Sequence, residues 1–133
     1  MMKGGCLCGS VRYEASAAPL HSGFCHCRDC QRATGTGHSC YMIFEARDFS
    51  HSGELHSFAV VAESGAPSVR HFCPTCGSTV LASGAPGEAR WTVFAGTLDD
   101  PSEFVPEAAI MTRSRQRWDH VQGELPEFSC MPG

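Results

Sequence analysis

The stretch Cys25-His26-Cys27-Arg28-Asp29-Cys30 places three thiols within six residues. Short loops with the spacings Cys-x-Cys and Cys-x-x-Cys can aim three sulfurs at one point. Zinc sites that only hold a fold are usually filled by four protein ligands, whereas zinc sites that do chemistry keep three and leave a fourth position for water or substrate. We therefore predict that Cys25, Cys27 and Cys30 form an open, catalytic metal site.

A second set of thiols lies in two turns far apart in the sequence, Cys6-Leu7-Cys8 and Cys73-Pro74-Thr75-Cys76. Four thiolates are the ligand set of a closed structural zinc site. Gly77 follows the second turn and can take the positive φ that lets the backbone fold under a metal. Because zinc binding is coupled to folding and contributes on the order of 10 kcal/mol, we expect this site to be a principal support of the domain.

Spacing alone leaves other arrangements of these cysteines open. A zinc ribbon would combine the two Cys-x-x-Cys turns, with the ligands Cys27, Cys30, Cys73 and Cys76. Thiolates also bind iron–sulfur clusters. A dithiol redox motif at Cys27 and Cys30 would leave Cys25 unexplained. We favour the division into a closed set of four thiols and an open set of three.

The composition is that of a folded chain with an acidic balance. Of 133 residues, 42% are hydrophobic and 18% are charged, which is typical of one globular domain, and we take 1–133 as that domain. A formal net charge of -4 argues against a broad surface for nucleic acid or for an anionic membrane, because both need a basic excess. We expect neither as a partner, and binding of a small molecule stays open.

Cysteine usage bears on the compartment. Nine cysteines would suggest disulfides in a short secreted chain. Residues 1–6 lack the apolar run of a signal peptide, and no stretch approaches the length of a membrane span. We therefore expect a cytoplasmic protein, in which close-set cysteines are metal ligands or catalytic thiols rather than disulfides.

Hydrophobic patterning predicts a small, mainly β domain. Residues 10–15 alternate apolar with polar side chains, as in a half-buried strand, directly after the first cysteine pair. Further strands are expected at 39–44, 55–61, 78–82, 90–95 and 107–112. Residues 30–34 predict one helical turn, and the tail from about residue 123 is expected to be irregular.

These motifs, taken in order, resemble the family of glutathione-dependent formaldehyde-activating enzymes, also called the centromere protein V/Gfa domain family. The resemblance covers nearly the whole chain, through residues 4–13, 25–35, 72–78, 95–101 and 114–118. All seven cysteines of the family pattern are present in order. The resemblance implies a single-domain, β-rich fold of the Mss4-like, or β-tent, kind.

The resemblance also implies roles for the thiols. It implies a structural zinc held by Cys6, Cys8, Cys73 and Cys76. It implies a catalytic zinc held by Cys25, Cys27 and Cys30, which makes two zinc ions per chain. The implied activity is that of a carbon–sulfur lyase that joins glutathione to formaldehyde as S-(hydroxymethyl)glutathione, so the partner would be a small thiol or a thiol–aldehyde adduct. The alternative is a non-catalytic, zinc-stapled module for binding or scaffolding.

Three residues near the central thiols have candidate roles. Arg28 and Arg32 flank the open site and could pair with the carboxylates of glutathione, or they could be solvated loop arginines. His26 lies between two ligands, so an extended backbone would point its side chain to the opposite side. We expect it to be a surface group or a group that supports the ligands.

Other residues are expected to have no part in the site. Cys40, in an apolar run, is expected to be a buried small hydrophobe. Cys130 is expected to be a free thiol; a methionine-sulfoxide reductase would need a catalytic thiol there, but no motif supports one. The basic stretch 113–117 is expected to be a solvated face next to one buried aromatic, Trp118.

Overall fold

Two β-sheets and a single α-helix make up residues 1–131, the part of the chain that a computed structural model describes. This confirms the mainly β, single-domain fold built around cysteine turns. Within these residues, no helix has both the length and the apolar character that crossing a membrane would need.

The smaller sheet is antiparallel and has the order β1-β2-β5. Its strands are β1 (Met2–Gly5), β2 (Arg12–Ala15) and β5 (Phe49–Ser52). The alternation predicted for β2 is present, since Tyr13 and Ala15 are buried while the residues before them are exposed. The sequence does not predict β1, because two of its four residues are glycines that carry no side-chain pattern.

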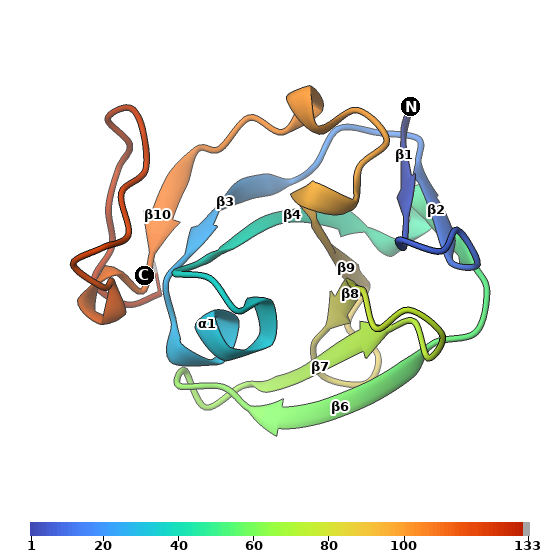
Figure 1. The fold of residues 1–133 in the computed structure, drawn as a ribbon, viewed down its shortest axis with the longest axis horizontal. Helices are drawn as coiled ribbons and strands as arrows, with labels where there is room; N and C mark the ends of the chain where they lie inside the picture. The colour runs from blue at the N-terminus through green and yellow to red at the C-terminus, as the bar shows by residue number, and fades with distance from the viewer. Residues whose placement is uncertain (132–133) are drawn as a thin grey trace.

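The larger sheet has the order β10-β3-β4-β9-β8-β7-β6. Its strands are β3 (His21–Cys25), β4 (Ser39–Glu45), β6 (His56–Val61), β7 (Pro67–Phe72), β8 (Thr79–Ser83), β9 (Arg90–Phe94) and β10 (Ala108–Ile110). Neighbouring strands are antiparallel except for β10 and β3, which run parallel. The sheet is strongly curved, with β10 and β3 towards one end and β7 and β6 towards the other (Figure 1).

Strand β4 separates the core from a pocket. On one face of β4, the side chains that pack in the main hydrophobic core are Cys40, Met42 and Phe44. On the other face, the side chains that line the pocket are Ser39, Tyr41 and Ile43. Successive side chains of a strand point to opposite faces, so this one strand contributes to both environments.

The helix α1 (Arg28–Thr34) lies within the curve of the large sheet, between β4 and β7 (Figure 1). It ends at Gly35, whose φ of 75° lies in the left-handed region that glycine adopts without strain. The helix begins at Arg28, slightly before the predicted helical turn, because Cys27 already caps it.

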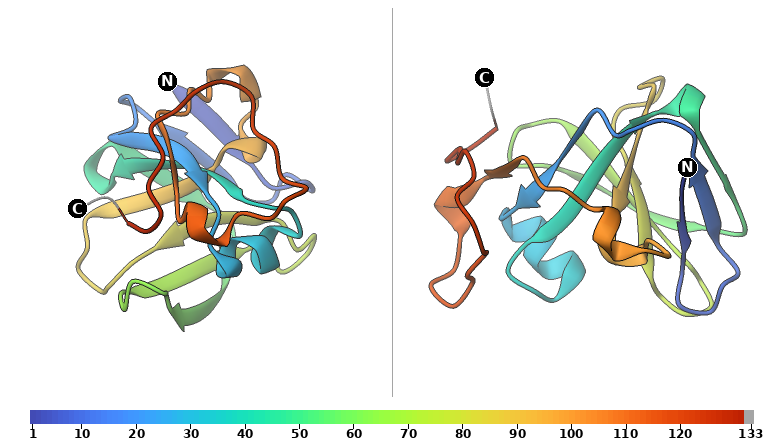
Figure 2. Two further views of the ribbon diagram at one scale, coloured as in Figure 1. Left: turned by 90° about the vertical axis from the view of Figure 1, so that its left-hand side faces the viewer. Right: turned by 90° about the horizontal axis from the view of Figure 1, so that it is seen from above.

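The C-terminal segment follows a short 3₁₀ turn, η4 (Thr112–Ser114), and lies beside β10 on the outside of the sheet (Figures 1 and 2). The Ala109 amide donates to the Pro126 carbonyl at 3.0 Å, and the Phe128 amide donates to the Ala109 carbonyl at 2.9 Å. Beyond this bridge the described part of the tail is irregular, as predicted. Pro132 and Gly133 lie outside the described residues.

Most of the large sheet follows the predicted pattern. The strands expected at 39–44, 55–61, 78–82, 90–95 and 107–112 are confirmed as β4, β6, β8, β9 and β10. The sequence does not predict β3 or β7. Strand β3 contains Gly23, which is required there because β10 passes so close that a Cβ atom would lie 2.4 Å from the Ala108 carbonyl oxygen.

We predict that Gly23→Ala lowers the free energy of unfolding by about 1–3 kcal/mol, since the added methyl group forces β3 and β10 apart. Gly96→Ala is the matched control, because a Cβ there meets no atom within 4 Å. The control is expected to be neutral or slightly stabilising. Urea denaturation at a fixed zinc concentration measures both. Equal stability of the two variants would contradict the close packing of β3 against β10.

Candidate metal centre

Four thiols meet where the turn between β1 and β2 approaches the turn between β7 and β8. The sulfurs of Cys6, Cys8, Cys73 and Cys76 all lie within 4.8 Å of one another. Cys8 Sγ is 3.6 Å from Cys6 Sγ and 3.7 Å from Cys73 Sγ. Gly77, with a φ of 78°, closes the second turn by donating its amide to the Cys73 carbonyl at 2.8 Å.

Hydrogen bonds to two of these sulfurs, those of Cys6 and Cys76, favour the thiolate form. The Val11 amide donates to Cys6 Sγ at 3.2 Å. The Ser78 hydroxyl, 3.2 Å from Cys76 Sγ, is the main group that lowers the pKa of Cys76 to about 5. Thiolate is the form of cysteine that binds metals, and four sulfurs suit zinc. This group can therefore hold a metal ion.

Three further thiols converge at the start of α1. Cys25 ends β3, Cys27 caps α1, and Cys30 lies in the first turn of the helix. Their sulfurs lie within 4.8 Å of one another, and the Cys30 amide donates to Cys27 Sγ at 3.2 Å. No fourth His, Cys, Asp or Glu from residues 1–131 joins this group. The donor set fits a thiophilic metal with one position left for another ligand.

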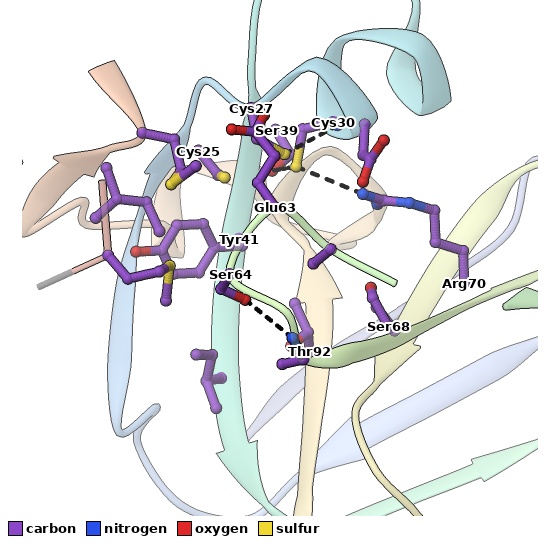
Figure 3. A pocket seen from close by; sticks show the side chains of 18 of the residues that line it. Cys25, Cys27, Cys30, Ser39, Tyr41, Glu63, Ser64, Ser68, Arg70 and Thr92 are labelled. Atoms are coloured by element: carbon purple, nitrogen blue, oxygen red, sulfur yellow. Dashed lines mark hydrogen bonds between the residues drawn. The ribbon is translucent and has the colours of Figure 1, made fainter. Parts of the chain in front are cut away.

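Charge in this group concentrates on Cys30. The Ser39 hydroxyl donates to Cys30 Sγ at 3.2 Å, and Arg70 Nη2 lies 3.6 Å from the same sulfur (Figure 3). Hydrogen bonds from Cys25 and Cys27, with help from Ser39 and Arg70, lower the pKa of Cys30. The pKa of Cys25 is raised by its bonds to the other two sulfurs. A divalent cation bound by the three sulfurs would remove this difference between Cys25 and Cys30, because it favours the thiolate form of every ligand.

A pocket of roughly 260 Å³ extends from the three thiols along the inner face of the large sheet (Figure 3). The large side chains of its walls are Tyr41, Ile43, Phe94, Ile110, Met111 and Met131. The polar side chains opposite them come from β7 and from the turn between β6 and β7, and these are Glu63, Ser64, Ser68 and Arg70. A small molecule in this pocket could reach a metal held by the three thiols.

Comparison with known proteins identifies the family. The family model described as "Glutathione-dependent formaldehyde-activating enzyme" matches residues 1–114. The chain belongs to this family. Among solved structures, the crystal structure of a Rhodobacter sphaeroides protein is similar to this chain, with 19% sequence identity and a TM-score of 0.60 over 95% of this chain and 99% of that one. This likeness shows a shared fold. The comparison with curated proteins gave no match.

In this member of the glutathione-dependent formaldehyde-activating enzyme family, the thiols are grouped as a set of four and a set of three. A zinc ribbon would instead bring Cys27 and Cys30 to Cys73 and Cys76, and the structure does not group them in this way. The assignment of a structural zinc to the set of four and a catalytic zinc to the set of three stays a prediction.

In this family member, the positively charged side chain that lines the pocket comes from β7 and not from the cysteine motif. Arg28 donates to the Gln31 side-chain oxygen, and neither Arg28 nor Arg32 lines the pocket. Arg70 lines it instead, beside Cys30. Of the two roles considered for Arg28 and Arg32, pairing with a carboxylate in the site is therefore not supported by the geometry.

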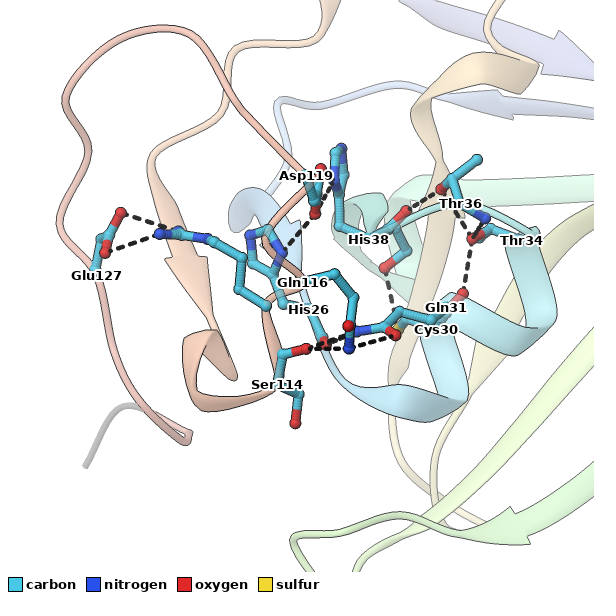
Figure 4. Close-up of polar contacts among 12 residues, drawn as sticks. His26, Cys30, Gln31, Thr34, Thr36, His38, Ser114, Gln116, Asp119 and Glu127 are labelled. Atoms are coloured by element: carbon cyan, nitrogen blue, oxygen red, sulfur yellow. Dashed lines mark hydrogen bonds and ion pairs between the residues drawn. The ribbon is translucent and has the colours of Figure 1, made fainter.

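His26 is fully buried, so the expectation of a surface position is wrong. Its Nδ1 lies 3.0 Å from the Asp119 carboxylate, which also pairs with His38 Nδ1 at 2.9 Å (Figure 4). Gln31 Nε2 donates to the His26 carbonyl at 2.8 Å and to the Ser114 carbonyl at 2.9 Å. These contacts join the loop that carries the thiols to the C-terminal segment. His26 therefore supports the position of this loop and is not itself in the group of three thiols.

The basic stretch 113–117, which begins within η4, is largely paired. Arg113 lies 2.8 Å from Glu63, and Arg115 lies 2.9 Å from Glu127. Trp118 is 66% exposed, so the expectation of a buried aromatic is wrong.

The two cysteines outside the groups differ in their surroundings. Cys40 is half-buried and packs against the core, whereas Cys130 is exposed and forms no disulfide with any described residue.

Sequence reasoning missed three contributors to the site: Tyr41, Arg70 and Asp119. The alternation along 39–44 is a signal that could have placed Tyr41 on the face of Ser39. Arg70 and Asp119 have no such signal, because they lie 40 and 81 residues along the chain from the groups they contact, Cys30 and His38.

We predict that Asp119→Ala lowers the free energy of unfolding by about 2–3 kcal/mol, because it removes the buried carboxylate that bonds His38 Nδ1 at 2.9 Å and lies 3.0 Å from His26. Asp99→Ala is the control, since Asp99 pairs with Arg12 on the exposed surface. The control is expected to cost less than about 1 kcal/mol. Urea denaturation followed by circular dichroism compares them. A similar loss of unfolding free energy in both variants would contradict a stabilising role of Asp119 beyond that of an exposed ion pair.

Proposed function

We propose that this protein is a zinc-dependent carbon–sulfur lyase that acts on the adduct of a thiol and an aldehyde, such as S-(hydroxymethyl)glutathione. One observation carries the proposal: three thiols converge at the end of a pocket, and no fourth ligand from the described residues completes the set. Membership of the family supports the reaction class. A position in the cytoplasm stays a prediction.

In this proposal the two thiol groups have different tasks. The structural zinc belongs to Cys6, Cys8, Cys73 and Cys76. The catalytic zinc belongs to Cys25, Cys27 and Cys30. Bound there, the metal supplies Lewis acidity and an affinity for thiolate sulfur.

The reaction needs no outside oxidant or reductant. The carbon–sulfur bond of the adduct breaks, its hydroxyl loses a proton to become the carbonyl of the aldehyde, and the sulfur leaves as a thiol after taking up a proton. A leaving thiolate adds negative charge beside three cysteines. Arg70, next to Cys30, offsets that charge, and the side chains of Tyr41, Ile43 and Phe94 give the pocket an apolar lining near the thiols.

Metal content tests the assignment of the two groups. We expect two zinc ions per chain, one for each thiol group, by elemental analysis of the purified protein. The ion at the three-thiol group should be lost first to a chelator, because it has one ligand fewer. Cys27→Ser should lower the content by one ion. Cys40→Ser, which changes a thiol on the core face of β4, is the matched control and should keep both. A single tightly held zinc would contradict this division.

Activity separates the enzyme from the binding module. We predict that the protein speeds the interconversion of glutathione plus formaldehyde, or of another thiol–aldehyde pair, with the adduct, measured by exchange spectroscopy. Cys27→Ser should reduce the catalysed rate at least about 100-fold while the fold persists. Cys40→Ser should keep the rate. If no adduct is turned over by the protein with both zinc ions bound, the non-catalytic module is the correct description.

A further inference from the structure

We propose that the pocket selects adducts of aldehydes that carry an apolar body of several carbons, in preference to the adduct of formaldehyde. This inference rests on the proposed lyase function and adds the substrate class. It concerns the part of the pocket beyond the thiols.

The size of the pocket exceeds what a one-carbon aldehyde needs. Its volume of roughly 260 Å³ approaches that of pockets for small organic ligands, which begin at about 300 Å³. A hydroxymethyl group has two heavy atoms and is about twice the size of one water, whose share of liquid volume is about 30 Å³. The formaldehyde adduct would therefore leave most of the space beside the reacting carbon unfilled.

The apolar wall begins at the thiols. Tyr41, Ile110 and Met111 form one buried hydrophobic cluster, and Cys25, Cys27 and Ile43 pack against it. The reacting carbon of an adduct whose sulfur lies at the three thiols would thus be next to this wall. An alkyl or aryl group on that carbon would replace water against an apolar surface, which favours its binding.

The charged side chains of the pocket are too few for a peptide-like ligand. They are Asp29, Glu63 and Arg70. Glu63 is already paired with Arg113, and Arg70 lies beside Cys30. Glutathione carries two carboxylates and an ammonium group, so its polar body is poorly matched to this interior. The interior instead suits the side chain of the aldehyde.

The backbone conformation of Met111 supports the interpretation of this wall as part of a ligand site. It is the one non-glycine residue of the described chain with a positive φ, at 54°, and its side chain lines the pocket. Residues other than glycine adopt this conformation at a cost, and such strain gathers at ligand sites. The Ser114 amide, which donates to the Met111 carbonyl at 3.1 Å, helps to hold this backbone in place.

The test uses the zinc-loaded protein and two series of ligands built on one thiol. The first is the set of glutathione adducts of formaldehyde, propanal, butanal and benzaldehyde, compared by kcat/KM. The second is S-methyl-, S-propyl- and S-benzylglutathione, which cannot react, compared by calorimetric titration. We expect affinity to rise about fourfold for each methylene that enters the pocket, and kcat/KM to rise in the same order.

A variant links the effect to the wall. Ile43→Thr should reduce the gain from S-methyl- to S-propylglutathione at least about threefold, since it places a hydroxyl on the apolar face. The matched control is Val105→Thr, the same kind of change at a side chain that is 69% exposed and outside the pocket, and it should keep the full gain. Unchanged binding of S-methylglutathione by Ile43→Thr would show that the variant is folded.

The outcomes distinguish the two proposals. A flat S-alkyl series, with the formaldehyde adduct turned over as fast as the others, would overturn the apolar preference and leave the lyase function standing. A rising S-alkyl series without turnover of any adduct would support the apolar pocket and overturn the lyase function. A rising series in both sets supports both.

Discussion

The sulfurs of Cys8 and Cys73 lie 3.7 Å apart although 65 residues separate them in the chain, and the rest of the structure depends on this convergence. It joins the turn between β1 and β2 to the turn between β7 and β8, and so links the small sheet to the large one. Four thiolates at such distances repel one another unless a cation is shared among them. A metal ion bound at this group would therefore contribute its binding free energy to folding.

Strand β4 connects the packing of the core to the shape of the pocket. Met42 and Phe44 are almost fully buried in the core, so the register of the strand cannot slip without exposing them. The residues that alternate with them, Tyr41 and Ile43, then have to face the opposite side, where they line the wall of the pocket. The core thus fixes which side chains surround the three thiols. This coupling explains why a small domain can present a shaped pocket without a second domain to close it.

The grouping of the thiols could be predicted from the sequence, whereas the residues that surround the three thiols could not. Cys25, Cys27 and Cys30 could be recognised because a ligand loop is a local feature, whose spacing is read directly. Arg70 could not, because it lies 40 residues from Cys30 along the chain, and no local pattern shows that β7 faces the three thiols. His26 was placed on the correct side of the strand, but its burial depends on Asp119, which arrives from a segment without regular structure.

The apolar wall and the charged thiols act on each other. Apolar surroundings make an unpaired thiolate costly, and they also strengthen every interaction that a thiolate does make. Without a cation, hydrogen bonding among the three sulfurs makes their pKa values unequal: the pKa of Cys30 is lowered and the pKa of Cys25 is raised. One bound cation allows all three to ionise, and Arg70 beside Cys30 offsets part of the excess negative charge. In the proposed enzyme, the wall that would hold the carbon body of a substrate would therefore also raise the cost of leaving the three thiolates without a metal ion.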